Sequence, residues 1–122
     1  MVLVDTSVWI SHLRAGDTDL RSLLEDGQVV CHDYIIGEIG CGNLKNRNEI
    51  LSLLNDLPRA EIAEHQEVMR LIEKRKLQGK GLGYIDMHLL ASAVLTGIPL
   101  WTLDSKLKQV AVKLKVDYKP AS

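Results

Sequence analysis

Four carboxylates differ from the other acids of the sequence in where they lie. Asp5 and Asp104 each follow a short apolar run, whereas Glu38 and Asp86 each interrupt a nearly apolar stretch. A buried carboxylate without a partner costs several kcal/mol, so such positions call for a cation, hydrogen-bond donors or a metal ion. Taken singly, each acid has an ordinary structural explanation: a helix cap for Asp5 and Asp104, a buried ion pair for Glu38 and Asp86.

Taken together, the four acids favour metal chemistry. Carboxylates that converge on one point repel one another and raise one another's pKa values. A divalent cation relieves this repulsion, and ligation by oxygen alone suits Mg²⁺ or Mn²⁺ rather than zinc. Such an ion would activate a water and stabilise charge on a phosphodiester. We therefore expect Asp5, Glu38, Asp86 and Asp104 to be both metal ligands and catalytic residues.

The elements that must position these acids alternate along the chain. Short apolar runs predict strands at residues 2–4, 28–31 and 99–102, with further short strands at 60–62 and 115–118. Helical spacing predicts helices at residues 8–13, 20–24, 34–39, 50–57, 68–72, 84–95 and 107–114. Apolar strands separated by helices predict the α/β class, a three-layer α/β/α sandwich with a central parallel sheet. Ligands of such sheets bind beyond the carboxyl ends of the strands, where Asp5 and Asp104 fall.

Length and composition exclude several classes. The 122 residues fit a single domain over residues 1–122, with 46% hydrophobic and 25% charged residues and a net charge of −1. No run is long enough to cross a bilayer, so no membrane association is expected, and the balanced charge argues against a basic nucleic-acid coat protein. The start of the sequence lacks the features of a signal peptide. We therefore expect a cytoplasmic protein, with Cys31 and Cys41 as reduced, buried thiols.

In order along the chain, these motifs resemble the PIN-domain ribonucleases and, more narrowly, the VapC toxins of bacterial type II toxin–antitoxin systems. They are Val-Asp5-Thr-Ser-Val-Trp-Ile, Glu38 in its apolar helix, Gly-Tyr-Ile-Asp86-Met-His-Leu-Leu-Ala-Ser-Ala, and Leu-Trp-Thr-Leu-Asp104. The resemblance covers essentially the whole chain. It implies a PIN-like fold and a Mg²⁺- or Mn²⁺-dependent endoribonuclease. It also implies a homodimer neutralised by a cognate VapB-like antitoxin.

The resemblance also assigns roles to single residues. Asp5, Glu38 and Asp86 match the three most regular acids of the family, and Asp104 matches the more variable fourth. Ser7 matches a hydroxyl that commonly follows the first acid and would orient it, and Thr102 is a candidate for the same task. Family members often carry another acid just after the fourth, where this sequence has Ser-Lys, so the share of Asp104 in metal binding is open.

Basic residues offer candidates for RNA binding. Arg75, Lys76 and Lys80 precede Asp86 and could hold RNA phosphates, or could form a solvated helix end. The later lysines are expected to form only a solvated face: Lys106, Lys108, Lys113, Lys115 and Lys119. His88 is expected to be a partly buried histidine with its hydrogen bonds satisfied rather than a catalytic base.

Two alternatives remain open. A Mg²⁺-dependent phosphotransfer domain on a similar sheet would also gather acids at strand ends. The sequence lacks its usual pairs, because Ser7 stands where a haloacid-type phosphatase has a second aspartate. A non-catalytic PIN-like protein-binding module is the other alternative, and the presence of all four acids argues against it.

Overall fold

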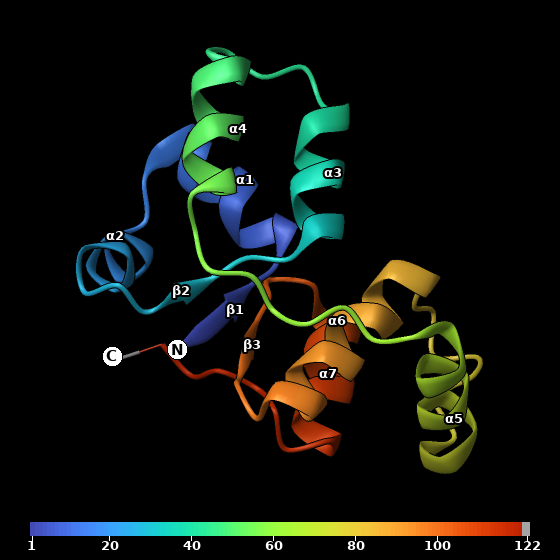
Figure 1. Cartoon of the computed structure of the whole chain (residues 1–122). Helices are drawn as coiled ribbons and strands as arrows, with labels where there is room; N and C mark the ends of the chain where they lie inside the picture. Colours follow the sequence, from blue (N-terminus) through green and yellow to red (C-terminus); the bar gives the residue numbers. More distant parts are fainter. Residues whose placement is uncertain (121–122) are drawn as a thin grey trace.

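The computed structural model describes residues 1–120 and consists of three short strands and seven helices in that part of the chain (Figure 1). The strands are β1 (Val2–Val4), β2 (Val29–Val30) and β3 (Leu100–Trp101). The helices are α1 (Thr6–Ala15), α2 (Thr18–Glu25), α3 (Asp33–Cys41), α4 (Arg47–Asn55), α5 (His65–Arg75), α6 (Tyr84–Thr96) and α7 (Ser105–Lys113). The predicted α/β class and parallel sheet are confirmed.

The sheet has the order β2-β1-β3, and both pairings are parallel. Because the chain passes from the central strand β1 to one neighbour and then crosses to the other, the carboxyl ends of β1 and β3 flank a switch point in strand order. In Figure 1, α1, α3 and α4 lie on one side of the strands and α6 and α7 on the other. The switch point therefore lies between the two sets of helices.

Two predicted strands are reduced to single bridges at the sheet edges. Arg59 forms an isolated parallel bridge with Cys31, and Asp117 forms one with Leu100. Each segment makes few backbone hydrogen bonds before it leaves the sheet, such as the 2.7 Å bond from the Leu100 N–H to the Val116 carbonyl. The predicted strands at residues 60–62 and 115–118 were therefore too long, and the first bridge lies one residue before its predicted range.

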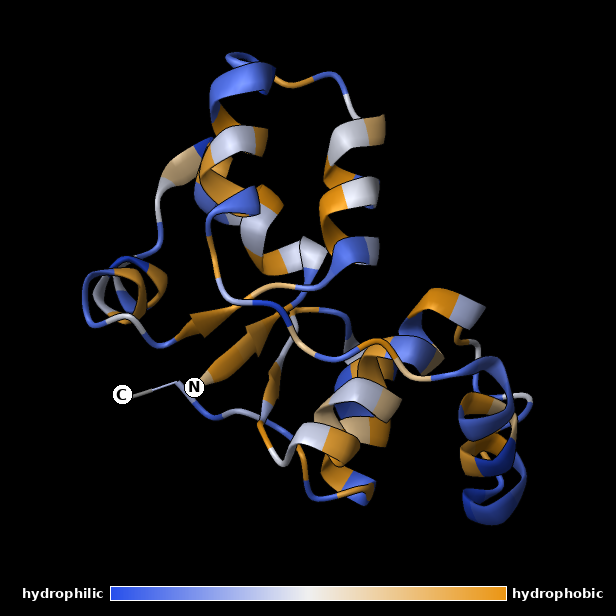
Figure 2. Ribbon diagram, in the orientation of Figure 1, coloured by the Kyte–Doolittle hydropathy of each residue, from blue (hydrophilic) through white to orange (hydrophobic). Residues whose placement is uncertain are grey.

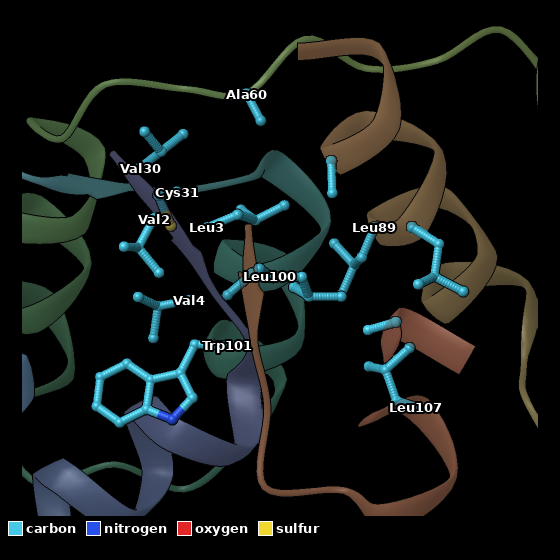
Figure 3. Close-up of a cluster of buried hydrophobic side chains, with 14 of the residues drawn as sticks. Val2, Leu3, Val4, Val30, Cys31, Ala60, Leu89, Leu100, Trp101 and Leu107 are labelled. Atoms are coloured by element: carbon cyan, nitrogen blue, oxygen red, sulfur yellow. The ribbon is translucent and has the colours of Figure 1, made fainter. Parts of the chain in front are cut away.

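A continuous apolar core joins the strands to the helices. Figure 2 shows β1 and β2 apolar throughout, while most helices carry apolar residues on one face only. Leu3 on β1 and Leu100 on β3 are almost fully buried, and they meet Leu89 of α6 and Leu107 of α7 (Figure 3). Burying one such leucine is worth about 1.5–3 kcal/mol, so this packing fixes the strand ends on which the acids sit.

The two cysteines differ from their prediction in part. Cys31 is buried, as predicted, but Cys41 is exposed. The prediction was wrong for Cys41 because the residue ends α3, beyond the turns that pack on the core. No helix within residues 1–120 is long and apolar enough to cross a membrane.

Candidate active site

Asp5 lies at the carboxyl end of the central strand, where two hydroxyl groups hold it. Its Oδ2 accepts hydrogen bonds from Ser7 Oγ at 2.8 Å and from Thr102 Oγ1 at 2.7 Å. Asp5 is 6% exposed, so these bonds replace water that the carboxylate has lost. The structure therefore brings the hydroxyls of Ser7 and Thr102 together at the first acid.

The same two hydroxyls also fix the loop after β3. Ser7 Oγ accepts the Leu103 N–H at 3.0 Å, and Thr102 Oγ1 accepts the Asp104 N–H at 3.0 Å. Asp104 then caps α7, because its Oδ1 accepts the backbone N–H groups of Lys106 and Leu107 at 2.9 and 3.1 Å. Asp104 is thus a helix cap whose backbone is tied to Thr102 beside Asp5, and its part in metal binding stays a prediction.

Glu38 and Asp86 are held by one donor each. Thr6 Oγ1 donates a 2.8 Å hydrogen bond to Glu38 Oε1, and the Gly83 N–H donates a 3.1 Å bond to Asp86 Oδ2. Sequence reasoning missed Thr6, although its position directly after Asp5 was the available signal. Glu38 is exposed and Asp86 half-buried, so the expected burial was wrong for Glu38, whose face of α3 opens to solvent.

The four acids influence one another electrostatically. Although Glu38 is exposed, the protein around its carboxylate displaces part of its water and so raises its pKa; the Thr6 hydrogen bond opposes this, and the charges of Asp5 and Asp86 raise the pKa further. Burial also raises the pKa of Asp86; the Gly83 hydrogen bond opposes this, and the charges of Asp5 and Asp104 add to the rise. The four carboxylates are therefore linked electrostatically, because Asp5 acts on both Glu38 and Asp86, and Asp104 acts on Asp86.

The donor set fits a hard divalent cation. Among residues 1–120, each acid engages one carboxylate oxygen with a side-chain hydroxyl or backbone N–H and leaves the other oxygen without a donor. In this part of the chain the one ion pair joins Arg59 to Asp33, so no lysine or arginine neutralises the four acids. No three of the described acids and histidines are close enough to form a preformed cage. Mg²⁺ suits so open a set, because it keeps several waters.

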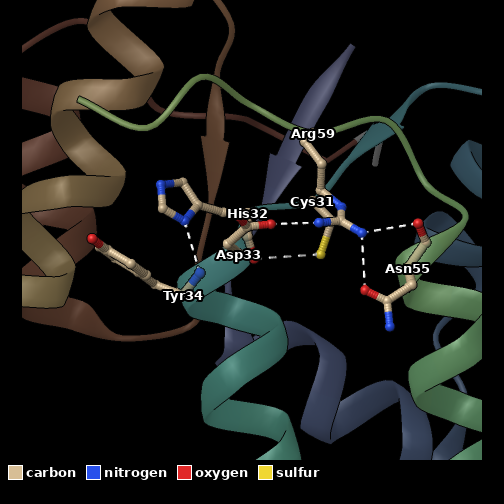
Figure 4. A network of polar contacts seen from close by, with 6 residues as sticks. All are labelled: Cys31, His32, Asp33, Tyr34, Asn55 and Arg59. Atoms are coloured by element: carbon tan, nitrogen blue, oxygen red, sulfur yellow. Dashed lines mark hydrogen bonds and ion pairs between the residues drawn. The ribbon is translucent and has the colours of Figure 1, made fainter. Parts of the chain in front are cut away.

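A polar network at the start of α3 positions the helix that carries Glu38. The side chain of His32 accepts the Tyr34 N–H at 3.0 Å and so caps the helix (Figure 4). The guanidinium of Arg59 bonds to Asp33 and donates to both the carbonyl and the side-chain oxygen of Asn55 at 2.9 Å. This network ties α3 to the end of α4 and to the edge of the sheet.

The histidines near the site are mostly structural. His32 is fully buried and its Nε2 lies 3.2 Å from Ser92 Oγ, which donates to the Glu61 carbonyl at 2.6 Å. Burial lowers the pKa of His32 to about 4, with the nearby His88 contributing. His88 is only 2% exposed and, among the described residues, its Nδ1 has no hydrogen-bond partner. The expected satisfied histidine was therefore wrong: edge-to-face contacts with Tyr34 and Tyr84 surround it.

The predicted basic residues lie at different places. Arg75 is tied to the end of α7, because its Nη2 donates to the Lys113 carbonyl at 3.4 Å and Lys113 Nζ donates to the Arg75 carbonyl at 3.0 Å. That end of α7 is opposite to Asp104. Lys76 is the exposed C-cap of α5, and Lys80 is exposed in the glycine loop before Asp86. Of the three, Lys80 is the nearest to the acids along the chain.

The fold and the site together define a class of protein. The model of the PIN domain family matches residues 2–113, so the chain belongs to the PIN-domain family. A particular relative narrows this class. The chain is 48% identical over 109 residues to Ribonuclease VapC32 of Mycobacterium tuberculosis, in both strain H37Rv and strain CDC 1551 / Oshkosh, and the match covers 88% of each chain. The resemblance to VapC-type PIN-domain proteins is confirmed.

Solved structures share the fold at low sequence identity. VapBC-1 from nontypeable Haemophilus influenzae aligns with a TM-score of 0.73 and 15% identity over 98% of both chains. PAE2754 from Pyrobaculum aerophilum aligns with a TM-score of 0.64 and 18% identity over 93% of this chain and 88% of its own. FitAB bound to an IR36 DNA fragment gives a TM-score of 0.64 and 17% identity over 92% and 91%. These likenesses support the PIN-like α/β/α architecture.

Proposed function

We propose that the chain is the toxin of a toxin–antitoxin pair and acts as a Mg²⁺- or Mn²⁺-dependent endoribonuclease. The observation that supports this proposal is the electrostatic link among the four carboxylates, each of which has one oxygen without a donor in the described chain. The 48% identity to Ribonuclease VapC32 supports RNA as the substrate. Asp5, Glu38 and Asp86 would hold the ion, with help from Asp104.

Each residue of the site has a defined task in this proposal. When bound, the metal ion would supply an activated water and positive charge beside the scissile phosphodiester. Ser7 and Thr102 hold Asp5 in one orientation, so that its Oδ1 points to a fixed place. Thr6 does the same for Glu38, and the Gly83 N–H for Asp86. Cleavage would leave a 5′-phosphate end.

An apolar groove supports an antitoxin as the protein partner. A hollow of about 300 Å³ lies between α1, α2 and α4, with an almost wholly apolar lining. Leu53, in this lining, is 62% exposed, so part of this apolar hollow faces solvent, and contiguous exposed apolar surface is typical of a protein–protein interface. The name of the fold neighbour VapBC-1 combines VapB and VapC. We propose that a VapB-like antitoxin covers this groove and that the toxin is a cytoplasmic homodimer.

RNA contacts remain a proposal for Arg75, Lys76 and Lys80. Lys80 is the best placed of the three, because the loop that carries it leads directly to Gly83 and Asp86. The contacts between Arg75 and Lys113 support a structural task for Arg75 beside any role with RNA.

The test is RNA cleavage by the purified chain with Mg²⁺, with a chelator, and in the variant Asp5→Asn. We expect cleavage only by the unmodified chain with metal, because an asparagine side chain would keep the shape of the ligand but not its charge. Circular dichroism would verify that the variant is folded. Cleavage that survives both the chelator and the substitution would overturn the mechanism. Phosphorylation by acetyl phosphate would instead favour the phosphotransfer alternative.

A further inference from the structure

Lys106 lies against the glycine loop that precedes Asp86. A Cβ atom added to Gly81 would lie 3.0 Å from both Cδ and Nζ of Lys106 and 3.3 Å from its Cε. Gly81 has a positive φ of 79°, a conformation that glycine adopts without steric cost. The end of the Lys106 side chain therefore lies over the glycine backbone, where an added Cβ would make it shift by a few tenths of an ångström and a large side chain would take its place.

This contact joins the two segments that carry the last two acids. The backbone N–H of Lys106 donates to Asp104 Oδ1 at 2.9 Å, which places the lysine in the first turn of α7. The loop that holds Gly81 continues to Gly83, whose N–H donates to Asp86. The lysine is thus anchored next to Asp104 and reaches across to the approach to Asp86.

Helix stability does not explain a lysine at this position. The first turn of a helix disfavours a cation, and the capping carboxylate of Asp104 binds backbone N–H groups of this turn rather than the lysine ammonium. Nor does a salt bridge explain it, because in residues 1–120 the Lys106 ammonium has no carboxylate within ion-pair distance. Sequence reasoning assigned Lys106 to a solvated face, but its contact with Gly81 distinguishes it from the other lysines of α7.

We propose that Lys106 is an RNA-positioning residue, which binds a phosphate of the RNA strand at the edge of the four-acid site. This inference rests on the proposed ribonuclease function. A polyanion that approaches four carboxylates is repelled, and a cation held beside them offers a compensating contact for one phosphate. Gly81 has a matching task, because it leaves the space in which the lysine side chain lies.

The test measures RNA binding without turnover. A fluorescein-labelled single-stranded RNA is titrated with protein in EDTA at several salt concentrations, and binding is followed by anisotropy. We expect Lys106→Gln to weaken binding and to reduce the slope of log affinity against log salt by about 0.7, the value for one phosphate contact on a single strand. Lys106→Arg should keep the slope. Lys108→Gln, which removes the same charge two residues along α7, is the control and should leave the slope unchanged.

Two glycine variants test the geometry. Gly81→Leu places a large side chain where the lysine lies, so it should reduce the salt slope as Lys106→Gln does, and the double variant should show no further loss. Gly79→Leu is the matched control, because Gly79 has a similar φ of 73° but nothing within 4 Å of an added Cβ. It should cause the same backbone strain without moving the lysine, and so leave the slope unchanged.

The outcomes separate this inference from the proposed function. With Mg²⁺, Lys106→Gln should raise KM for RNA cleavage with little change in kcat, the signature of a lost binding contact. If the unmodified chain cleaves RNA but Lys106→Gln has the same salt slope and the same KM, the role of Lys106 is overturned while the ribonuclease function stands. If the unmodified chain neither binds nor cleaves RNA, the proposed function itself is overturned.

Discussion

The hydroxyl of Thr102 donates a 2.7 Å hydrogen bond to the carboxylate of Asp5 across 97 positions of sequence. It joins the residue that ends the central strand to the loop after its neighbour β3. Ser7 donates to the same oxygen at 2.8 Å. The orientation of the first acid therefore depends on two separate segments of the chain.

Loss of either hydroxyl should slow cleavage without abolishing it. We expect Thr102→Val and Ser7→Ala each to lower kcat/KM for RNA about 10- to 100-fold, the usual effect of removing a group that orients a ligand. Because both hydroxyls bind one oxygen, the double variant should lose less than the product of the single effects. Steady-state cleavage rates would show this, and unchanged rates in both single variants would contradict it.

Asp86→Asn should stabilise the protein in the absence of metal. Burial raises the pKa of Asp86, and the charges of Asp5 and Asp104 raise it further, so the ionised carboxylate is unfavourable in the folded state at neutral pH. Removing that charge should raise the free energy of unfolding, because the folded state no longer holds an ionised carboxylate beside Asp5 and Asp104. Urea unfolding in EDTA at pH 7 would measure it. Glu73→Gln on exposed α5 is the control and should have a smaller effect; a loss of stability in Asp86→Asn would oppose this account.

His32 should make the protein sensitive to mild acid. Its pKa is lowered from 6.5 to about 4 in the folded state, first by burial, so between these values the unfolded chain binds the extra proton. The stability that the folded state gains from this pKa difference is fully present above pH 6.5 and is lost as the pH falls toward 4. It amounts to about 3 kcal/mol. His32→Asn keeps a capping side chain but removes the titration. Its unfolding free energy should change less between pH 6.5 and 4 than that of the unmodified chain; parallel profiles would show that His32 is not responsible.

Leu53→Glu should prevent neutralisation by an antitoxin. Leu53 lines the groove between α1, α2 and α4 and is 62% exposed, so a charge there should disturb a partner's apolar contacts but not the fold. Val112→Glu, at a 50% exposed position on α7, is the matched control. Titration of each variant with a cognate antitoxin would measure the affinity, with at least a roughly tenfold loss expected for Leu53→Glu alone. Equal affinities would place the partner elsewhere.

The fold was predictable where apolar runs are continuous. Val2–Val4 forms β1 as its composition predicts, and residues 84–95 form most of the buried helix α6. The edge segments were harder, because a single bridge such as that between Arg59 and Cys31 depends on where the chain leaves the sheet. Local sequence does not contain that information.

Residues of the site could be predicted where burying their side chains would be energetically unfavourable. A carboxylate in an apolar stretch requires an explanation, which is why Asp86 could be singled out. Thr6 and Lys106 are ordinary polar residues in the first turns of their helices, so nothing in the local sequence singles them out. Thr6 contacts Glu38 and Lys106 contacts Gly81, and both partners lie far away in sequence. The contact between His32 and Ser92 was not predicted for the same reason, because 60 positions separate the two residues.

The most direct test of the central claim is a calorimetric titration of Mn²⁺ into the unmodified chain and into Asp5→Asn. If the four carboxylates share one cation site, the unmodified chain should bind the ion. The variant, which loses the ligand at the centre of the site, should bind it at least about ten times more weakly. Equal affinities in the two proteins, or no binding by the unmodified chain, would contradict the claim that these acids form a metal centre.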